Sequence, residues 1–254
     1  MIVGRVAITA AGSGIGLAVA RAFAAQGAQV HICDIDAAAV RTAAADGLTA
    51  SEVDVSDPAA TDRWIDGALE ALGGLDVLVN NAGIAGPTAL VEDVATVDWE
   101  RCLAVGVTSH YRTCARVIPS MKAARAGSII NISSTAGQHG IGMRAPYTAA
   151  KWAVIGLTKT LAIELGPYDV RANAICPGSV DGIRMRDVIA REAAARGAQP
   201  EAVEREYLEG QSIARFVQRD EIADLCLFLA SDAARMISGQ AIAVDGHTET
   251  FHID

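Results

Sequence analysis

The sequence alternates between two kinds of segment, and this alternation limits the possible folds more than any other feature. Short apolar runs rich in β-branched residues are separated by longer, alanine-rich stretches with the spacing of amphipathic helices. Strands are expected at 5–10, 29–34, 48–53, 76–80, 128–133, 170–176 and 241–245. Helices are expected at 15–26, 37–45, 59–72, 98–122, 146–165 and 221–230, with two shorter pieces around 185–209. Strands that are apolar throughout are buried on both faces, so the pattern predicts an α/β fold with a doubly wound parallel sheet.

Composition and charge exclude several classes of protein. Of the 254 residues, 51% are hydrophobic and 20% are charged, which excludes a disordered chain. No apolar run reaches the roughly 18 to 20 residues of a membrane span, so no membrane partner is expected. The formal charge of −9 repels phosphate backbones, so no nucleic-acid partner is expected either. The first strand begins almost at once and leaves no room for a secretory leader, which predicts a cytoplasmic protein.

The cysteines and histidines show no pattern of a metal site. The five cysteines contain no CxxC pair and lie in apolar segments, where cysteine packs as a small apolar residue. The five histidines lack metal-ligand spacing, and His31 and His110 are expected to be packed residues. We therefore expect no disulfide and no metal.

No linker rich in proline, glycine or serine divides the chain, so residues 1–254 are expected to form one domain. Strand periodicity stops at about 182–216, where the sequence becomes charged. This stretch is either a solvated helical insertion or a helical lid over a substrate. The second interpretation follows from the rule that ligands of doubly wound sheets lie beyond the carboxyl ends of the strands.

A glycine-rich turn follows the first strand directly and opens onto a helix. Glycines let the backbone approach a pyrophosphate, whose charge is stabilised by free N–H groups and by the helix N-terminus. Asp34 ends the second strand 20 residues after Gly14, the spacing at which a carboxylate reaches the hydroxyls of the adenosine ribose. Because neither Ser13 nor Ile35 is basic, the sequence predicts NAD rather than NADP. The residues expected to hold the cofactor at this turn are Ala10, Ser13, Gly14, Ile15 and Gly16.

Tyr147 and Lys151 are four residues apart on an expected helix, which places them one turn apart on the same face. A phenol has a pKa near 10 and is a poor base at neutral pH, but an adjacent ammonium favours the phenolate. Ser134 follows the fifth strand and supplies a hydroxyl that could hold a substrate oxygen. These three residues are the expected catalytic group.

In their order along the chain, these residues resemble the short-chain dehydrogenase/reductase family of Rossmann-fold oxidoreductases. Further matching elements extend the resemblance over nearly the whole chain: Asp54-Val55, Asn80 to Gly83, Pro177-Gly178 and Gln240 to Gly246. The resemblance implies a seven-stranded parallel sheet and a homotetramer packed through 98–122 and 146–165. It also implies transfer of a hydride between nicotinamide and a secondary alcohol or ketone.

The resemblance further implies a role for each matching residue. Tyr147 would be the general acid/base, Ser134 would orient the substrate oxygen, and Lys151 would lower the pKa of Tyr147 and bond the nicotinamide ribose. Tyr147 and Lys151 thus count among the expected cofactor contacts as well. The remaining ones are Ile35 beside Asp34, Asp54 and Val55 near the adenine, Asn81, Ala82 and Gly83 beside the adenosine ribose, and Pro177, Gly178 and Val180 over the nicotinamide.

Three positions depart from the family's pattern. Ala10 stands at the first glycine of the turn, and Gly182 stands where a threonine is usual near the nicotinamide carboxamide. Gly106 replaces an asparagine of the fourth helix. We expect the backbone carbonyl of Gly106 to hold a water that links to Lys151, as the family's asparagine carbonyl does.

The segments expected to line the substrate are 135–146, with Gln138, His139 and Arg144, and the lid, with Arg184 and Arg186. Their hydrogen-bond donors and positive charge favour a small polar substrate such as a polyol, a sugar derivative or a hydroxy acid. The alternative is that these arginines only pair with carboxylates on the surface.

Two other functions remain open. An NADPH-dependent reductase of 3-oxoacyl thioesters is disfavoured by Asp34. A non-catalytic NAD sensor would account for Gly106, but it has no need of Ser134, Tyr147 and Lys151 in register.

Overall fold

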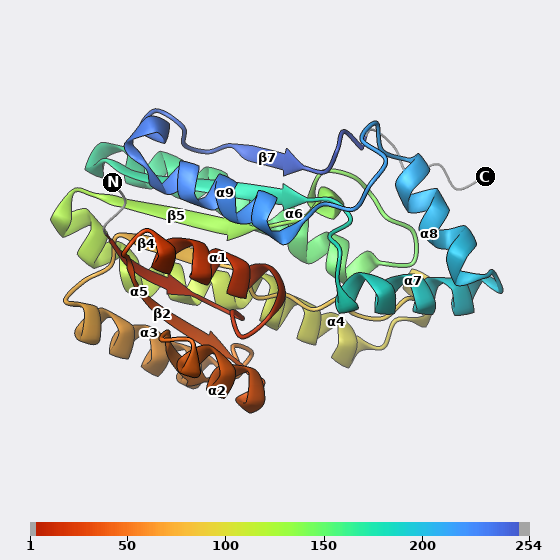
Figure 1. Cartoon of the computed structure of the whole chain (residues 1–254), viewed down its shortest axis with the longest axis horizontal. Coiled ribbons are helices and arrows are strands. Elements are labelled where there is room, and N and C mark those ends of the chain that lie inside the picture. Colours follow the sequence, from red (N-terminus) through yellow and green to blue (C-terminus); the bar gives the residue numbers. More distant parts are fainter. Residues whose placement is uncertain (1–3, 249–254) are drawn as a thin grey trace.

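The computed structural model describes residues 4–248, and its centre is a seven-stranded parallel sheet (Figure 1). The strand order is β3-β2-β1-β4-β5-β6-β7. The strands are β1 (Arg5–Ile8), β2 (Gln29–Asp34), β3 (Thr49–Glu52), β4 (Val77–Asn80), β5 (Gly127–Ile132), β6 (Val170–Pro177) and β7 (Ala241–Val244). The doubly wound parallel sheet predicted from the alternating segments is confirmed.

Helices cover both faces of the sheet because its strands alternate side chains between two apolar cores. Val6 and Ile8 of β1 join a core with α1, α2 and α9, whereas Ala7 points into a second core with α3, α5 and α6. The helices are α1 (Gly14–Ala25), α2 (Ala37–Ala45), α3 (Pro58–Leu72), α4 (Thr96–Leu103), α5 (Ser109–Ala124), α6 (Ala145–Leu165), α7 (Ile183–Arg196), α8 (Pro200–Glu209) and α9 (Arg219–Ala230). All five cysteines are buried, and the structure thus agrees with their expected packing role.

The direction of winding changes between β1 and β4. Residue Val6 of β1 pairs with Val30 of β2 on one side and with Val77 of β4 on the other. The chain therefore builds β1 to β3 outward in one direction and β4 to β7 in the other. In such sheets the connections diverge at the switch and leave a crevice at the carboxyl ends of the strands.

The single helix expected at 98–122 is the main error in the predicted elements. The chain instead forms α4, a five-residue π-helix called η2 (Ala104–Thr108), and α5. In η2 the N–H of Ser109 reaches back five residues to the carbonyl of Ala104, and the Ser109 hydroxyl donates to the Val105 carbonyl at 2.7 Å. Periodicity does not reveal such a bulge, because one extra residue leaves the apolar character of the segment unchanged.

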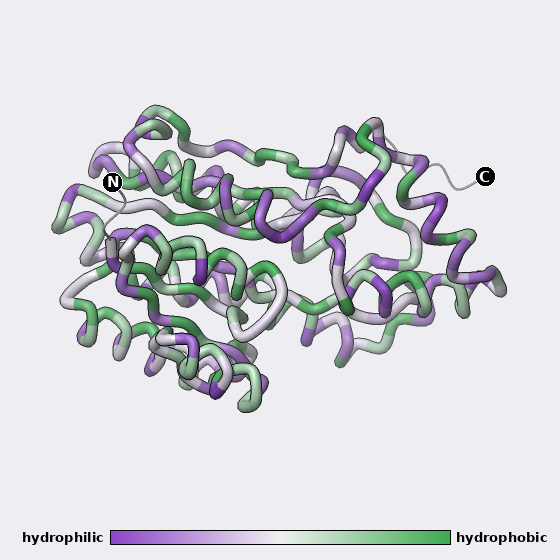
Figure 2. The backbone as a smooth tube through the Cα atoms, viewed as in Figure 1, coloured by the Kyte–Doolittle hydropathy of each residue, from purple (hydrophilic) through white to green (hydrophobic). Residues whose placement is uncertain are grey.

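The charged stretch at 182–216 contains α7 and α8, which lie beyond the carboxyl ends of the strands (Figure 1). Ile189, Ala193 and Val203 form a small apolar core of their own between the two helices. Hydrophilic segments are frequent along α8, whereas the central strands are largely hydrophobic (Figure 2). Among the residues described, no helix is both long and apolar enough to cross a membrane.

Candidate functional site

A cleft of about 470 Å³ opens at the carboxyl ends of the central strands, beside the point where the strand order reverses. This is where ligands of doubly wound sheets bind. Residues predicted to hold a dinucleotide and residues predicted to be catalytic line the same cleft. They are Ala10, Ser13, Gly14, Ile15, Asp34, Asn81, Gly83, Ser134, Tyr147, Lys151, Pro177, Gly178 and Val180.

The turn between β1 and α1 leaves room and hydrogen-bond donors for an anion. Ser13 precedes the helix but makes no side-chain cap, so it does not occupy the first N–H groups of α1. Gly14 has φ +57°, and a Cβ built on it would meet nothing within 4 Å. The first turn of α1 carries no acidic residue. These features fit the pyrophosphate of a dinucleotide.

Gly16 and Ala10 fix the backbone of this turn. A Cβ on Gly16 would lie 2.5 Å from the carbonyl oxygen of Ala10 and 2.6 Å from Nδ2 of Asn81, so only glycine fits. Ala10 has φ +51°, a left-handed conformation that costs an alanine roughly 1 kcal/mol. The alanine at this position therefore adopts a backbone conformation that glycine would adopt without this cost.

Asp34 lies at the end of β2, where it closes the turn. Its Oδ2 accepts a hydrogen bond from the Gly12 N–H at 2.9 Å, and its Oδ1 accepts one from the Asp36 N–H at 3.0 Å. The adjacent Ile35 is exposed and offers no positive charge. Two backbone contacts thus hold the carboxylate at the cleft wall, where an adenosine ribose is expected.

Thr9 joins the turn after β4 to the glycine turn, although sequence reasoning did not single it out. Its Oγ1 accepts hydrogen bonds from the N–H groups of Asn81 at 3.0 Å and Ala82 at 3.1 Å. Nδ2 of Asn81 donates to the Ala10 carbonyl at 2.7 Å. The predicted segment 81–83 is thereby held beside the turn expected to bind the pyrophosphate.

Ser134, Tyr147 and Lys151 meet at the carboxyl end of β5. Ser134 follows the strand, and Tyr147, whose pKa Ser134 helps to lower, lies near the start of α6. Nζ of Lys151 lies 5.8 Å from the centre of the Tyr147 ring. The same Nζ donates to the carbonyl of Ile132 at 2.8 Å, and Lys151 is buried. The structure brings the predicted catalytic group together.

The charges around Tyr147 favour its phenolate. Burial acts to raise the pKa of this phenol, but Lys151, Arg184 and the hydrogen bond with Ser134 outweigh burial and lower it from its usual value near 10. Burial in turn lowers the pKa of Lys151 to about 8, against the opposing effect of Tyr147. A lowered phenol pKa brings the basic form toward neutral pH, as general base catalysis requires.

We expect Lys151→Met to move the pH dependence of alcohol oxidation to higher pH. Activity rises as Tyr147 loses its proton, and the variant lacks the cation that favours the phenolate, so the rising limb of log kcat should shift by about one pH unit or more. Profiles for wild type and variant between about pH 6 and pH 10 measure this shift. Lys159→Met, on an exposed part of the same helix, is the matched control. An unshifted limb in Lys151→Met would contradict the electrostatic role.

Lys151 is backed by buried residues at and just after η2. A Cβ on Gly106 would lie 3.0 Å from Cβ of Ala150, so this stretch of backbone packs closely against α6. Nε2 of the fully buried His110 lies 3.0 Å from the Ala82 carbonyl oxygen. Burial, with a smaller effect of Lys151, lowers the pKa of His110 to about 3 and leaves it uncharged. His110 is the packed residue that was expected, and the water link from Gly106 stays a prediction.

Some predicted cofactor residues do not line the cleft: Gly16, Ile35, Asp54, Val55 and Ala82. Gly16 and the buried Ala82 support the cleft wall from behind. Asp54 is exposed after β3, where its Oδ1 accepts from the N–H and the hydroxyl of Ser56 at 2.8 and 2.7 Å. Cofactor contacts of these residues stay predictions.

The residues expected to line the substrate are only partly in place. Arg144 and Arg184 line the cleft, whereas Gln138, His139 and Arg186 lie outside its lining, and their contact with a substrate stays a prediction. Nε2 of Gln138 instead donates to the Ala241 carbonyl at 3.4 Å, and Nη1 of Arg186 lies 3.7 Å from the Asp181 carboxylate. The alternative of surface pairing thus holds for Arg186.

Sequence reasoning missed cleft residues at the ends of β5 and β6 and on α9, namely Ile132, Ser133, Ser179, Asp181 and Arg219. The other lining residues of this side fall within the expected segments: Thr135 and Ile141 in 135–146, and Gly182, Ile183, Met185, Val188 and Tyr207 in the lid. Tyr207 comes from α8 and Arg219 from α9, and no short motif connects them to the catalytic group. The apolar positions of the lid helices were the only sequence feature that pointed to such residues, because some of these positions face the cleft.

The backbone conformation at position 182 explains why glycine stands where the family usually has threonine. It precedes α7 with φ +149° and ψ 178°, a conformation open essentially to glycine alone. A Cβ there would also lie 3.1 Å from Nη2 of Arg219. The missing hydroxyl is therefore tied to the backbone path that leads from β6 into the lid.

Gly182→Thr is accordingly expected to lower the free energy of unfolding by about 1–3 kcal/mol, the usual cost of a strained backbone. Urea unfolding followed by circular dichroism measures this change. Gly140→Thr is the control, because Gly140 has no positive φ and a Cβ there meets nothing within 4 Å. Equal stability of the two variants would show that Gly182 tolerates a side chain.

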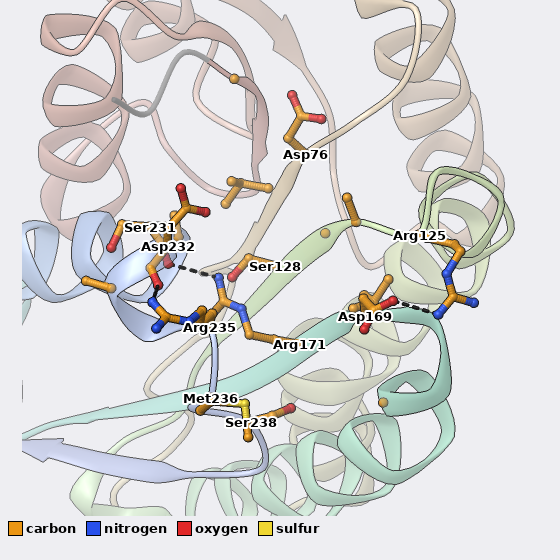
Figure 3. A pocket seen from close by; sticks show the side chains of 18 of the residues that line it. Asp76, Arg125, Ser128, Asp169, Arg171, Ser231, Asp232, Arg235, Met236 and Ser238 are labelled. Carbon is orange, nitrogen blue, oxygen red and sulfur yellow. Dashed lines mark hydrogen bonds and ion pairs between the residues drawn. The ribbon is translucent and has the colours of Figure 1, made fainter.

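A second, larger hollow of about 850 Å³ lies at the opposite, amino ends of β4, β5 and β6 (Figure 3). Its arginines are engaged with the protein: Nη2 of Arg125 lies 2.6 Å from Asp169, and Arg171 donates to the carbonyls of Leu229 and Ser231. Residues of the catalytic group do not line it. We assign the active site to the smaller cleft, because its position and its chemistry agree.

Known proteins resemble this chain over nearly its whole length. A family model described as Enoyl-(Acyl carrier protein) reductase matches residues 9–247. The chain is 37% identical over 246 residues to a D-beta-hydroxybutyrate dehydrogenase of Cupriavidus necator, covering 94% of this chain and 95% of that protein. It is 38% identical over 253 residues to the trans-4-hydroxycyclohexanecarboxylate dehydrogenase of Sinomonas cyclohexanicum, with 94% and 90% covered.

Solved structures also match this chain over nearly its whole length. NAD+-bound xylitol dehydrogenase matches with a TM-score of 0.90 and 30% identity, covering 95% of this chain and 97% of that one. Actinorhodin polyketide ketoreductase with NADPH matches with a TM-score of 0.90 and 31% identity, covering 95% and 96%. The likeness therefore extends over almost the whole chain in both sequence and fold.

Proposed function

We propose, from the premise that this chain belongs to the short-chain dehydrogenase/reductase family, that it is an NAD-dependent dehydrogenase of a small, polar secondary alcohol. As a member of the family it is an oxidoreductase that acts on CH–OH groups. One observation carries the proposal. Ser134, Tyr147 and Lys151 meet in a cleft whose other end fits the pyrophosphate of a dinucleotide.

Each catalytic side chain has a separate task in this proposal. The Tyr147 phenolate accepts the proton of the substrate hydroxyl during oxidation, and the phenol returns it during reduction. Ser134 holds the substrate oxygen beside the phenol, and Lys151 keeps the phenolate form accessible through its charge. The nicotinamide of a bound NAD supplies the acceptor or donor of the hydride.

Support for NAD over NADP comes from Asp34. A carboxylate at the end of β2 accepts a hydrogen bond from the free 2′-hydroxyl of NAD and repels the 2′-phosphate of NADP. The next residue, Ile35, cannot neutralise that repulsion. Both cofactors occur among the solved relatives, so the choice rests on the side chains at this strand end.

Support for a small polar substrate comes from the cleft and from the relatives. Arg144 and Arg184 present guanidinium groups on the side of the catalytic tyrosine. Several relatives are named for small polar alcohols, namely hydroxybutyrate, hydroxycyclohexanecarboxylate and xylitol. Others, at 38% identity, are named hydroxysteroid dehydrogenases, so the choice of substrate class rests on the arginines of the cleft. A steroid or long-chain alcohol would instead be expected to meet mainly aromatic and aliphatic side chains.

The test is formation of NADH by the purified chain with NAD and a panel of secondary polyols, sugar alcohols and hydroxy acids. NADH absorbance should rise with at least one member, and more slowly with NADP. Turnover of long-chain or polycyclic alcohols alone would overturn the substrate class. Binding of NAD without turnover of any alcohol would support a sensor instead.

We assign the lid role to α7 and α8. Met185 and Val188 of α7 and Tyr207 of α8 line the cleft, so closure of these helices would cover the substrate. Nη1 of Arg184 already reaches across to the Gly83 carbonyl, at 2.9 Å. The small apolar core between the two helices would let them move as one unit.

A homotetramer packed through the helices at 98–122 and 146–165 is the proposed assembly. Tyr111, Trp152 and Ile163 are exposed apolar residues on these helices, and contact with another copy would remove them from water. Light scattering should give about four times the mass of one chain. Ile163→Asp should lower that mass, whereas Met236→Asp, at an exposed site outside these helices, should not. A monomer at micromolar concentration would refute the tetramer.

A further inference from the structure

Arg144 is a buried cation that no carboxylate of the described residues faces in the cleft wall. It precedes α6 and is 7% exposed. One nitrogen, Nη2, donates to the Ala85 carbonyl at 3.2 Å, but Nε has no hydrogen-bond partner among residues 4–248. Leaving part of a buried guanidinium unpaired is costly, so such a group marks a place where a ligand completes the contacts.

The surroundings of Arg144 add more positive charge. Burial lowers the pKa of Arg144, Tyr147 and Tyr207 act to raise it, and Arg184 and Arg191 lower it further, although a guanidinium stays protonated at any working pH. Within the described part of the chain, no carboxylate lies at ion-pair distance from Arg144 or Arg184. Nearby acids are engaged elsewhere: Glu192 pairs with Arg196 and accepts from Tyr207, and Asp181 faces Arg186.

Both guanidinium groups lie close to the catalytic phenol. The central carbon of Arg144 is 5.1 Å from the centre of the Tyr147 ring, and that of Arg184 is 5.9 Å from it. An anion held by them would therefore sit near the carbon whose hydroxyl faces Tyr147. A planar guanidinium matches a carboxylate through two parallel hydrogen bonds.

We infer that Arg144, assisted by Arg184, binds a carboxylate of the substrate, so that the enzyme acts on a short hydroxy acid and its oxo acid. This inference rests on the proposed dehydrogenase function and narrows its substrate class. Polyols and neutral sugar derivatives lack the charge that the buried guanidinium requires.

The cofactor does not supply this counter-charge. The glycine turn that fits the pyrophosphate follows β1, two strands away from β5, which corresponds to roughly 10 Å across the sheet. The nicotinamide end of NAD, which lies nearer to Tyr147, carries no anionic group. The Tyr147 phenolate offsets only one of the three cations around it, Lys151, Arg144 and Arg184, so we assign the further anion at Arg144 to the substrate.

The test compares each hydroxy acid with its amide, which has nearly the same shape and no charge. The pairs are 3-hydroxybutyrate with 3-hydroxybutyramide, lactate with lactamide, and 4-hydroxycyclohexanecarboxylate with its amide. For at least one pair, kcat/KM with NAD should favour the acid by roughly tenfold to 100-fold, the range for loss of a charged hydrogen bond.

Arg144→Met then separates charge recognition from other effects. Arg144 also lowers the pKa of Tyr147, so the variant can slow every substrate, and the acid-to-amide ratio is the diagnostic quantity. That ratio should fall at least tenfold, mainly through KM, and Arg144→Lys should restore part of it. Arg186→Met, which removes an exposed cation outside the cleft, should leave the ratio unchanged.

Each outcome decides one of the two proposals. Equal kcat/KM for acid and amide, turnover of neutral alcohols alone, or an unchanged ratio in Arg144→Met would overturn the carboxylate site and leave the dehydrogenase intact. Absence of NADH with acids, amides and neutral alcohols alike would refute the proposed function, and the inference would fall with it.

Discussion

Replacing Tyr147 with phenylalanine should lower kcat for alcohol oxidation by roughly 10²- to 10⁴-fold, the contribution usual for a general acid/base. The variant keeps the ring, so its contacts with Lys151, Arg144 and Arg184 lose only the hydroxyl. NAD affinity should therefore change little. Steady-state rates of NADH formation and a fluorescence titration with NAD measure the two quantities separately.

Tyr168→Phe is the matched control for this variant. Tyr168 is exposed, and its ring lies under Nζ of Lys122, outside the cleft. It should keep the wild-type rate. If Tyr147→Phe did the same, the phenol would not be the proton acceptor. A parallel loss of NAD binding would instead point to a disturbed cleft.

The second large effect is expected at Asp34. Wild type should prefer NAD over NADP by roughly 100-fold in kcat/KM, because the carboxylate gains a charged hydrogen bond with one cofactor and repels the phosphate of the other. Asp34→Ala combined with Ile35→Arg should reverse the preference. The ratio of kcat/KM for the two cofactors, measured with one substrate, gives the result.

Asp36 provides the control, since it is a carboxylate two residues away with a different task. It caps α2 by accepting from the N–H groups of Ala38 and Ala39. Asp36→Ala should therefore lower stability by about 1 kcal/mol and leave the cofactor ratio unchanged. Comparable use of NAD and NADP by wild type would contradict the role given to Asp34.

The sheet was predictable because its strands are buried on both faces. The segment Val77–Asn80 begins with three apolar residues in a row and is buried at every position, whereas a half-exposed strand alternates apolar and polar residues. The glycine turn, Asp34 and the pair Tyr147/Lys151 were predictable for a related reason. Their spacing within one turn, strand or helix already determines their geometry.

The substrate side of the cleft was harder to predict, because it depends on contacts between distant segments. Arg144 and Arg186 look alike in sequence, yet one is buried beside the catalytic phenol and the other lies at the surface facing Asp181. Tyr207 reaches the cleft only because α8 folds back over the strand ends. Local spacing carries no information about such packing.

The π-helix between α4 and α5 gives this chain a constraint on its length. One extra residue in a helix rotates everything after it by about 100°. The buried residues of α4 and those of α5 therefore do not fall on one side of a single helical wheel. Point substitutions within 104–108 cannot remove that offset, whereas deletion of one residue would return the segment to a regular helix and turn α4 away from its present contacts. The packing behind Lys151 thus depends on the number of residues in this segment as well as on their types. An insertion or deletion here would disturb the active site even if every catalytic residue were retained.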